Sequence, residues 1–285
     1  MIKETAKTFY ADLAAGYAAK IRHPVPQYDD MIQCIIGLLA MRTPETVLDL
    51  GSGVGNLSQR VLQALPQARV TAVEASEEMV AAARHRLQTH ADRVTLLHQD
   101  MLVYEPEAPF DAVFSNLVLH NLPIDEKRRL LQAIVGWLRP GGAFIWGDFI
   151  RYSDPRLHAH FVQQRIDFAL AAGCDATLVT ENFDKEEKED YPLTAAETHR
   201  LASHTGFLDP QPGCTTRLPS SSCAGRDIRS RGCRVVRTDA GTRRGGDTGI
   251  NGILRVAASP HPRVTIKRCY LGYSTRSGPP ASVRR

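Results

Sequence analysis

The stretch Thr46–Gly55, TVLDLGSGVG, decides the fold of this chain. Val47, Leu48 and Leu50 form an apolar run typical of a short strand buried in a parallel sheet, and three glycines follow at alternate positions. Residues 56–65, NLSQRVLQAL, then carry apolar side chains at helical spacing. A strand, a glycine turn and a helix in this order direct free N–H groups and the positive helix end toward the turn, which favours a nucleotide-like ligand there.

The spacing of the glycines narrows the choice of ligand. A dinucleotide site has the pattern G-x-G-x-x-G/A and needs Gly or Ala at position 56, where this chain has Asn56. The stretch Asp49–Gly55, DLGSGVG, instead resembles the first motif of class I S-adenosylmethionine (SAM)-dependent methyltransferases. The resemblance implies SAM as the cofactor, and it implies cofactor contacts at Asp49, Gly51, Ser52, Gly53 and Gly55.

A second predicted strand, Arg69–Glu74, ends in an acid 19 residues after Gly55. A carboxylate at this place can accept two hydrogen bonds from ribose hydroxyls. The competing interpretation of Glu74 is a cap for the following helix. The resemblance also implies cofactor contacts at Ala75 and at Met79, with Met79 packed on the adenine face.

The third predicted strand, Val94–His98, is followed by Gln99-Asp100-Met101. This segment resembles the Gly-Asp-hydrophobic segment of the same family, although Gln99 replaces the usual glycine. The resemblance implies that Asp100 and Met101 contact the adenine edge. The alternative for Asp100 is a turn residue that touches no ligand.

The fourth predicted strand, Phe110–Asn116, precedes LVLHNLP. The resemblance implies that Asn116 lies near the sulfonium of SAM and that His120 faces the substrate. His120 is the candidate general base, because the ordinary pKa of imidazole lies near neutral pH. The alternative is a histidine that braces its loop, since the methyl group of SAM is electrophilic enough to react without a base.

We therefore predict an α/β fold with a doubly wound, mostly parallel sheet of the seven-stranded type and helices on both faces. Residues 1–45 are predicted to form an N-terminal helical cap, with a helix from about Tyr28 to Met41, and residues 46–211 the SAM-binding core. Arg22, Pro26 and Tyr28 resemble a segment that touches the cofactor in one branch of the family. The acidic run 181–190 is predicted to be a solvated loop, after a helix at 155–172 and before one at 194–205.

Residues 212–285 differ from the rest in composition. They carry 15 Lys and Arg against 3 Asp, a net charge of +12, whereas residues 1–211 have 20 basic against 28 acidic side chains, a net charge of −8. We predict a basic, low-order tail that disrupts the last hairpin of the sheet. Synonymous codons from Cys214 onward, shifted by one base, can encode V-H-D-P-F-A-I-I-F-L-R, so we hypothesise a frameshift near Gly213.

Several classes of protein are disfavoured by what the chain lacks. It has no run of about 18 apolar residues and no apolar leader, so we expect a cytoplasmic protein without a membrane span. The cysteines lack metal-ligand spacing, so no metal site is predicted, and Cys34 and Cys174 are expected to be reduced.

The predicted function is transfer of a methyl group from SAM to an unidentified small-molecule acceptor by in-line displacement, by a monomer or a homodimer. One alternative is the carboxy-SAM-dependent enzyme that carboxymethylates tRNA, which Arg22, Pro26, Tyr28 and Glu197-Thr198-His199 resemble. That enzyme has an arginine shortly before the late segment, where this chain has the acidic run. The other alternative is a non-catalytic SAM- or RNA-binding protein. A nicotinamide-dependent oxidoreductase is disfavoured by Asn56.

Overall fold

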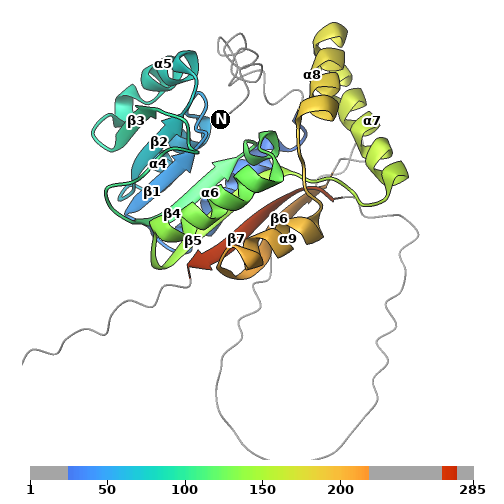
Figure 1. The fold of residues 1–285 in the computed structure, drawn as a ribbon. Helices are drawn as coiled ribbons and strands as arrows, with labels where there is room; N and C mark the ends of the chain where they lie inside the picture. Colours follow the sequence, from blue (N-terminus) through green and yellow to red (C-terminus); the bar gives the residue numbers. More distant parts are fainter. Residues whose placement is uncertain (1–24, 218–264, 275–285) are drawn as a thin grey trace, which may run out of the picture. The chain divides into compact units, whose positions relative to one another are not determined.

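The computed structural model describes residues 25–217 and 265–274, which build one seven-stranded sheet with helices packed on it (Figure 1). The strand order is β3-β2-β1-β4-β5-β7-β6. The strands are β1 (Thr46–Leu50), β2 (Arg69–Glu74), β3 (Val94–His98), β4 (Phe110–Asn116), β5 (Leu138–Phe149), β6 (Phe207–Arg217) and β7 (Thr265–Ser274). Strands β1 to β5 pair in parallel, whereas β7 is antiparallel to both β5 and β6. The predicted α/β fold is confirmed.

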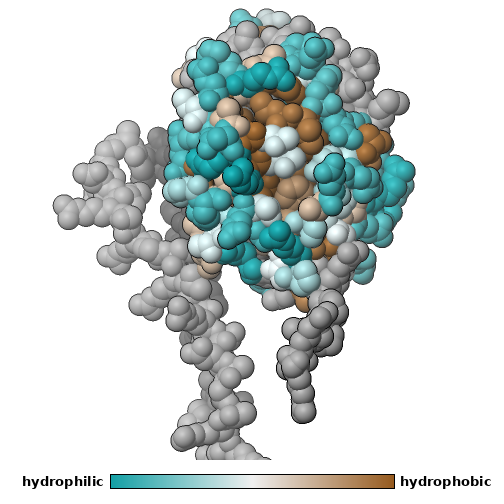
Figure 2. All heavy atoms as spheres, turned by 90° about the vertical axis from the view of Figure 1, so that its left-hand side faces the viewer, coloured by the Kyte–Doolittle hydropathy of each residue, from teal (hydrophilic) through white to brown (hydrophobic). Residues whose placement is uncertain are grey.

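Two apolar clusters cover the two faces of the sheet, because successive side chains of a strand point to opposite faces. Val47 of β1 belongs to the cluster beneath α3 and α4, whereas Leu48 and Leu50 belong to the cluster beneath α6 and α9. The helices are α3 (Tyr28–Ala40), α4 (Asn56–Ala64), α5 (Glu77–Arg86), α6 (Ile124–Trp137), α7 (Pro155–Ala171), α8 (Ala176–Glu189) and α9 (Ala195–His204). On the side of the molecule that carries β3 and α5, polar residues surround an apolar area (Figure 2).

The sheet ends differently from the sequence prediction. Residues 212–217 continue β6, and residues 265–274 form β7, so part of the predicted tail lies in the sheet as an antiparallel pair with three register shifts. The segment 265–274, TIKRCYLGYS, has the β-branched and aromatic residues that favour strands, which the average composition of the tail conceals. Residues 1–24, 218–264 and 275–285 lie outside the described residues, so the frameshift stays a prediction.

The acidic run 181–190 is helical rather than a loop, since α8 extends to Glu189. Glu186 of this helix forms a bidentate pair with the buried Arg165 of α7, with N–O distances of 2.6 and 2.8 Å. The charge of this run therefore holds two helices together in addition to facing solvent. None of the helices within residues 25–217 combines the length and the hydropathy that a membrane crossing requires.

The cysteines also depart in part from expectation. Cys174 is a free thiol, as predicted, but Cys34 is disulfide-bonded. The prediction for Cys34 considered spacing along the chain, whereas a disulfide depends on the distance between two cysteines after folding.

Arg93, which precedes β3, closes the carboxyl end of α4. Its guanidinium donates hydrogen bonds to four backbone carbonyls at distances of 2.9 to 3.2 Å, those of Leu62, Leu65, Pro66 and Ala68. The last carbonyls of a helix have no partner within the helix. Arg93 gives a donor to one of them, that of Leu62, and to three carbonyls of the segment that follows α4. It thereby joins the carboxyl end of α4 to the start of β3, at the edge of the sheet opposite the glycine turn.

We expect Arg93→Ala to lower the free energy of unfolding by about 2 to 3 kcal/mol, because several charge-assisted hydrogen bonds are lost together. Urea denaturation measures the change. The free energy of unfolding of Arg93→Lys should lie between those of the wild type and Arg93→Ala, since an ammonium lacks the planar fork of donors. Arg84→Ala, an exposed arginine on α5, is the matched control. Equal unfolding midpoints for the two alanine variants would contradict the assigned role.

Candidate functional site

A pocket opens at the carboxyl ends of β1, β2 and β4. The strand order reverses between β1 and β4, and in doubly wound sheets the crevice at this point is where ligands bind. The pocket is lined by Tyr28, Asp49, Gly51, Ser52, Gly53, Val54, Asn56, Leu57, Val73, Glu74, Ala75, Ser76, Met79, Gln99, Met101, Asn116, Leu117, Val118 and Asn121. The segments that the sequence analysis singled out therefore meet at one place.

The glycine turn forms the floor of this pocket. Gly51 has φ +73°, and a Cβ at this position would lie 2.6 Å from Cγ2 of Val118, so the loop after β4 packs directly on the bare backbone. Gly53 has φ +55° and nothing within 4 Å of its ideal Cβ position, which leaves room for a ligand to approach the main chain. Gly55, with φ +77°, faces Leu87 instead and does not line the pocket.

Asp49 lies at the base of the turn with 2% of its surface exposed. The hydroxyl of Ser58 donates a hydrogen bond of 2.6 Å to Oδ2 of Asp49. Burial, with a smaller contribution from the charge of Glu74, raises the pKa of Asp49 to about 7. Burial thus favours the protonated form of this carboxyl much more than water does.

Glu74, at the end of β2, supports the glycine turn as well as lining the pocket. Its Oε2 accepts from the backbone N–H of Gly53 at 2.9 Å, and its Oε1 accepts from those of Ala75 and Ser76 at 2.8 and 2.9 Å. Each carboxylate oxygen has more than one acceptor site, so the ribose contact stays a prediction beside this observed role. No local sequence pattern indicates the role of Glu74 in the turn, because this role depends on a backbone group 21 residues away.

The predicted adenine contacts divide into two groups. Ala75, Met79 and Met101 line the pocket, and both methionines are buried, which gives the apolar surface that an adenine ring packs on. Asp100 does not line it, and its Oδ1 accepts from the backbone N–H of Leu102 at 3.0 Å, as a turn residue does. Gln99 does line the pocket.

From the N-terminal side, Tyr28 at the start of α3 reaches the pocket. Its hydroxyl accepts a hydrogen bond of 3.3 Å from the side-chain amide of Asn56, the residue that the sequence analysis used to exclude a dinucleotide site. Arg22, the other candidate from this segment, lies outside the described residues.

Three oxygen atoms that are buried lack a hydrogen-bond partner within the described part of the chain and belong to residues that line the pocket: Ser52 Oγ, Asn116 Oδ1 and Asn121 Oδ1. Ser52 and Asn116 were predicted cofactor contacts. Asn121 was not, because it lies on a single turn of 3₁₀-helix, Leu119–Asn121, where no periodic pattern marks a functional side chain. Its position directly after His120 was the signal available.

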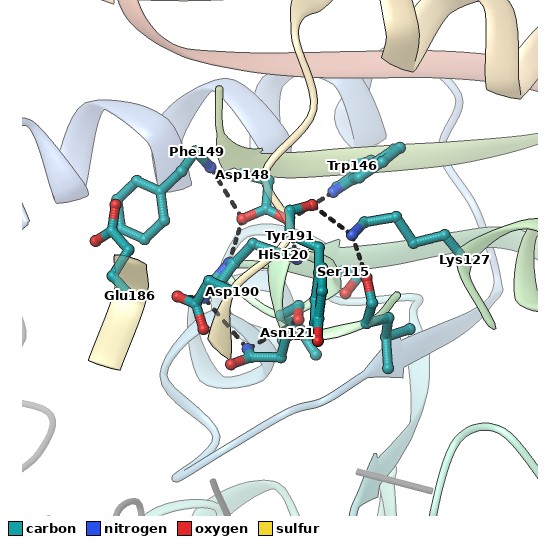
Figure 3. Close-up of polar contacts among 12 residues, drawn as sticks. Ser115, His120, Asn121, Lys127, Trp146, Asp148, Phe149, Glu186, Asp190 and Tyr191 are labelled. Atoms are coloured by element: carbon teal, nitrogen blue, oxygen red, sulfur yellow. Dashed lines mark hydrogen bonds and ion pairs between the residues drawn. The ribbon is translucent and has the colours of Figure 1, made fainter. Parts of the chain in front are cut away.

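His120, the candidate base, does not line the pocket and has 4% of its surface exposed. Its Nδ1 lies 2.6 Å from Oδ1 of Asp148, and its backbone N–H donates to Oδ2 of the same carboxylate at 2.9 Å (Figure 3). Burial lowers the pKa of His120, but the charges of Asp148, Asp190 and Glu186 outweigh it and raise the pKa above the ordinary value. The geometry is that of a braced histidine, and its role as a base stays a prediction.

Comparison with known proteins agrees with the motifs. The family described as Methyltransferase domain matches residues 47–142. A carboxy-S-adenosyl-L-methionine synthase from Pseudomonas fluorescens (strain SBW25) is 31% identical over 176 residues, which are 58% of this chain and 70% of the relative. A trans-aconitate 2-methyltransferase from Azoarcus sp. (strain BH72) is 39% identical over 97 residues, which are 34% of this chain and 36% of the relative.

The similarity also holds in three dimensions. A chain of known structure from Nostoc punctiforme PCC 73102, described as a candidate O-methyltransferase, superposes with a TM-score of 0.56 at 17% identity, covering 93% of this chain and 60% of that one. This likeness concerns the fold alone. The chain spans only about 36% to 40% of the length of the trans-aconitate methyltransferases that it matches. The domain match, together with the synthase matched over more than two thirds of its length, shows that the chain belongs to the class I SAM-dependent methyltransferases.

Proposed function

We propose that this protein binds SAM in the pocket at the glycine turn and transfers its methyl group to a small-molecule acceptor by in-line displacement. The observation that carries the proposal is the set of three unpartnered oxygens, Ser52 Oγ, Asn116 Oδ1 and Asn121 Oδ1, among the described lining residues. A buried acceptor without a donor costs about 1 to 3 kcal/mol. A ligand that carries positive charge and N–H or O–H donors would offset this cost, and SAM is such a ligand.

The other lining residues fit the remaining parts of SAM. Glu74 can accept from the ribose hydroxyls, and Met79 and Met101 can enclose the adenine. Asp49 and Glu74 give the pocket a negative character suited to a cationic ligand. SAM, when bound, supplies a methyl group on a positively charged sulfur, so the chain's own task is to hold the ligand and the acceptor in line.

Two observations support a small molecule as the acceptor. Residues 1–211 carry a net charge of −8, which opposes the phosphate contacts that an RNA acceptor needs. His120, the predicted base, lies behind the pocket wall, which supports a reaction in which the acceptor loses its proton without help from that side chain.

A second candidate is chemistry that uses or makes carboxy-SAM, which the name of the Pseudomonas relative suggests. The extra carboxylate of that ligand calls for a cation nearby, and the described lining residues include no Lys or Arg. This favours ordinary SAM. That relative is named as a synthase and not as a tRNA-modifying enzyme, so it does not support the tRNA alternative. Mass spectrometry of the ligand that copurifies with the chain separates SAM from carboxy-SAM.

Isothermal titration should show SAM binding to the purified chain and no binding of NAD. Glu74→Ala should weaken SAM binding by about 1.5 to 3 kcal/mol, because a charge-assisted contact and the support of the glycine turn are lost together. Glu74→Gln keeps an acceptor oxygen and is the matched control, with a smaller loss expected. Wild-type affinity in Glu74→Ala would remove Glu74 from the site, and binding of NAD in place of SAM would refute the proposed cofactor.

Asp49→Asn should raise the stability of the ligand-free protein while weakening SAM binding. The folded-state pKa of about 7 lies above the ordinary 3.8, so holding Asp49 ionised costs folding free energy, and this cost grows as the pH rises from about 4 to 7. The amide removes the cost, on the order of 1 to 3 kcal/mol at pH 8 and less at pH 5. Loss of the negative charge should weaken SAM binding about tenfold.

Thermal unfolding at pH 5 and pH 8, together with titration by SAM, measures both effects of Asp49→Asn. A melting temperature that does not change at either pH would contradict the prediction that burying the ionised Asp49 carboxylate costs folding free energy.

A further inference from the structure

The orientation of the Asn121 side chain follows from its neighbours. Its Nδ2 lies 2.9 Å from the backbone carbonyl oxygen of Val118, and a carbonyl oxygen can only accept. The atom facing it is therefore the nitrogen of the amide and not the oxygen. The second hydrogen of this nitrogen is directed at Nε2 of His120, 3.2 Å away. Oδ1 of Asn121 is then the end that is left without a partner in the described structure.

The contact with Asn121 determines the protonation of His120. Nε2 can meet an N–H donor only as an acceptor, so its proton must be on Nδ1, where Oδ1 of Asp148 accepts it at 2.6 Å. Asp148 is held in turn by the indole N–H of Trp146 and by the backbone N–H of Phe149, both at 2.9 Å. A continuous series of hydrogen bonds thus runs from the end of β5 to a residue of the pocket (Figure 3).

The charges around His120 favour the protonated form of its ring, the imidazolium. Asp190, at the end of α8, has Oδ2 3.7 Å from Nε2, while its Oδ1 lies 3.4 Å from Nζ of Lys185. Glu186 of the same helix adds negative charge. Two cations also lie nearby. Lys127 of α6 is fully buried, donates to the backbone carbonyl of Tyr191 at 2.6 Å and interacts with Asp148 and Asp190. Arg165 of α7 pairs with Glu186. The carboxylates stabilise the imidazolium, which would direct an N–H from Nε2 at the N–H of Asn121. The hydrogen bond to Asn121 is then lost, and Asp190 becomes the partner.

We propose that His120 is a positioning residue that controls Asn121: the neutral imidazole holds the Asn121 amide in place for SAM, and protonation releases it. The inference rests on the proposed function, because it assumes that SAM is the ligand beside Oδ1 of Asn121. SAM then binds the form with neutral His120, so the affinity for SAM falls as the pH falls through the pKa of His120. By linkage, bound SAM lowers that pKa by the same factor.

The first test compares the pH dependence of SAM binding, by isothermal titration between pH 6 and pH 7.5, in the wild type, His120→Gln and His204→Gln. The pKa of Lys127 is lowered only to about 8 by its burial, so this residue stays mostly protonated in the window. Asp49, whose pKa of about 7 lies in the same window, titrates in all three proteins, so the difference between their profiles isolates His120. Toward pH 6, the wild type and the His204→Gln control, an exposed histidine at the end of α9, should lose about tenfold more affinity than His120→Gln, the factor expected for one hydrogen bond. His120→Gln should keep only the slope that Asp49 contributes, since glutamine accepts from Asn121 at every pH. A histidine that only supports the fold would give a uniform loss with the wild-type slope retained, which would overturn the proposal.

The second test needs no substitution and so does not depend on the folding of a variant. Ring-nitrogen NMR of the wild type should show His120 in the Nδ1–H tautomer at high pH, with its pKa lowered on addition of SAM. A pKa unchanged or raised by SAM would overturn the proposal while leaving the proposed function intact. Absence of SAM binding at every pH would refute the proposed function, and this inference with it.

Discussion

The structure depends on the parallel pairing of β1 with β2 on one side and with β4 on the other. Four of the five residues of β1 are buried, so the strand can satisfy its backbone only through these two neighbours. Since the chain leaves β1 toward β2 and returns later to β4, the two connections depart to opposite sides. The space between them is the pocket. Apart from Tyr28 at the start of α3, every lining residue lies at a strand end or in the loop or helix that follows one.

Carboxylates connect this pocket to the rest of the molecule. Asp49, Glu74 and Asp148 end or nearly end three different strands. Each accepts a hydrogen bond from outside its own strand: Asp49 from Ser58 of α4, Glu74 from Gly53 of the glycine turn, and Asp148 from His120 after β4. An acceptor placed at a strand end can fix the backbone of a loop without a core of its own. The same groups bring negative charge near a ligand expected to be positive. Under the proposed function, Asp49 and Glu74 would combine positioning of the backbone with recognition of the ligand.

Much of the fold was predictable, because most of its strands and helices follow from short-range patterns of apolar and acidic residues. The apolar run before the glycines gave β1, the acids at 74 and 100 marked strand ends, and the apolar spacing in residues 28–41 predicted α3. The role of Glu74 in the turn and the brace on His120 depend on partners 21 and 28 residues away, which no local pattern reports. The acidic run 181–190 was predicted to be a solvated loop for the same reason, because its contact through Glu186 with Arg165 joins residues 21 positions apart. Average composition also hid a ten-residue strand in the basic tail.

The contact between Gly51 and Val118 has a consequence for how such an enzyme can evolve. A side chain at position 51 would push the loop that carries Asn121 and His120, so the turn after β1 and the loop after β4 must change together or not at all. Mutations that alter the choice of acceptor would thus accumulate more readily where no such coupling exists. The α7–α8 hairpin packs on its own small apolar cluster of Ala169, Val179 and Phe183, so its exposed positions can change independently of the glycine turn, whereas Glu186 and Asp190, which face His120, stay tied to the loop after β4.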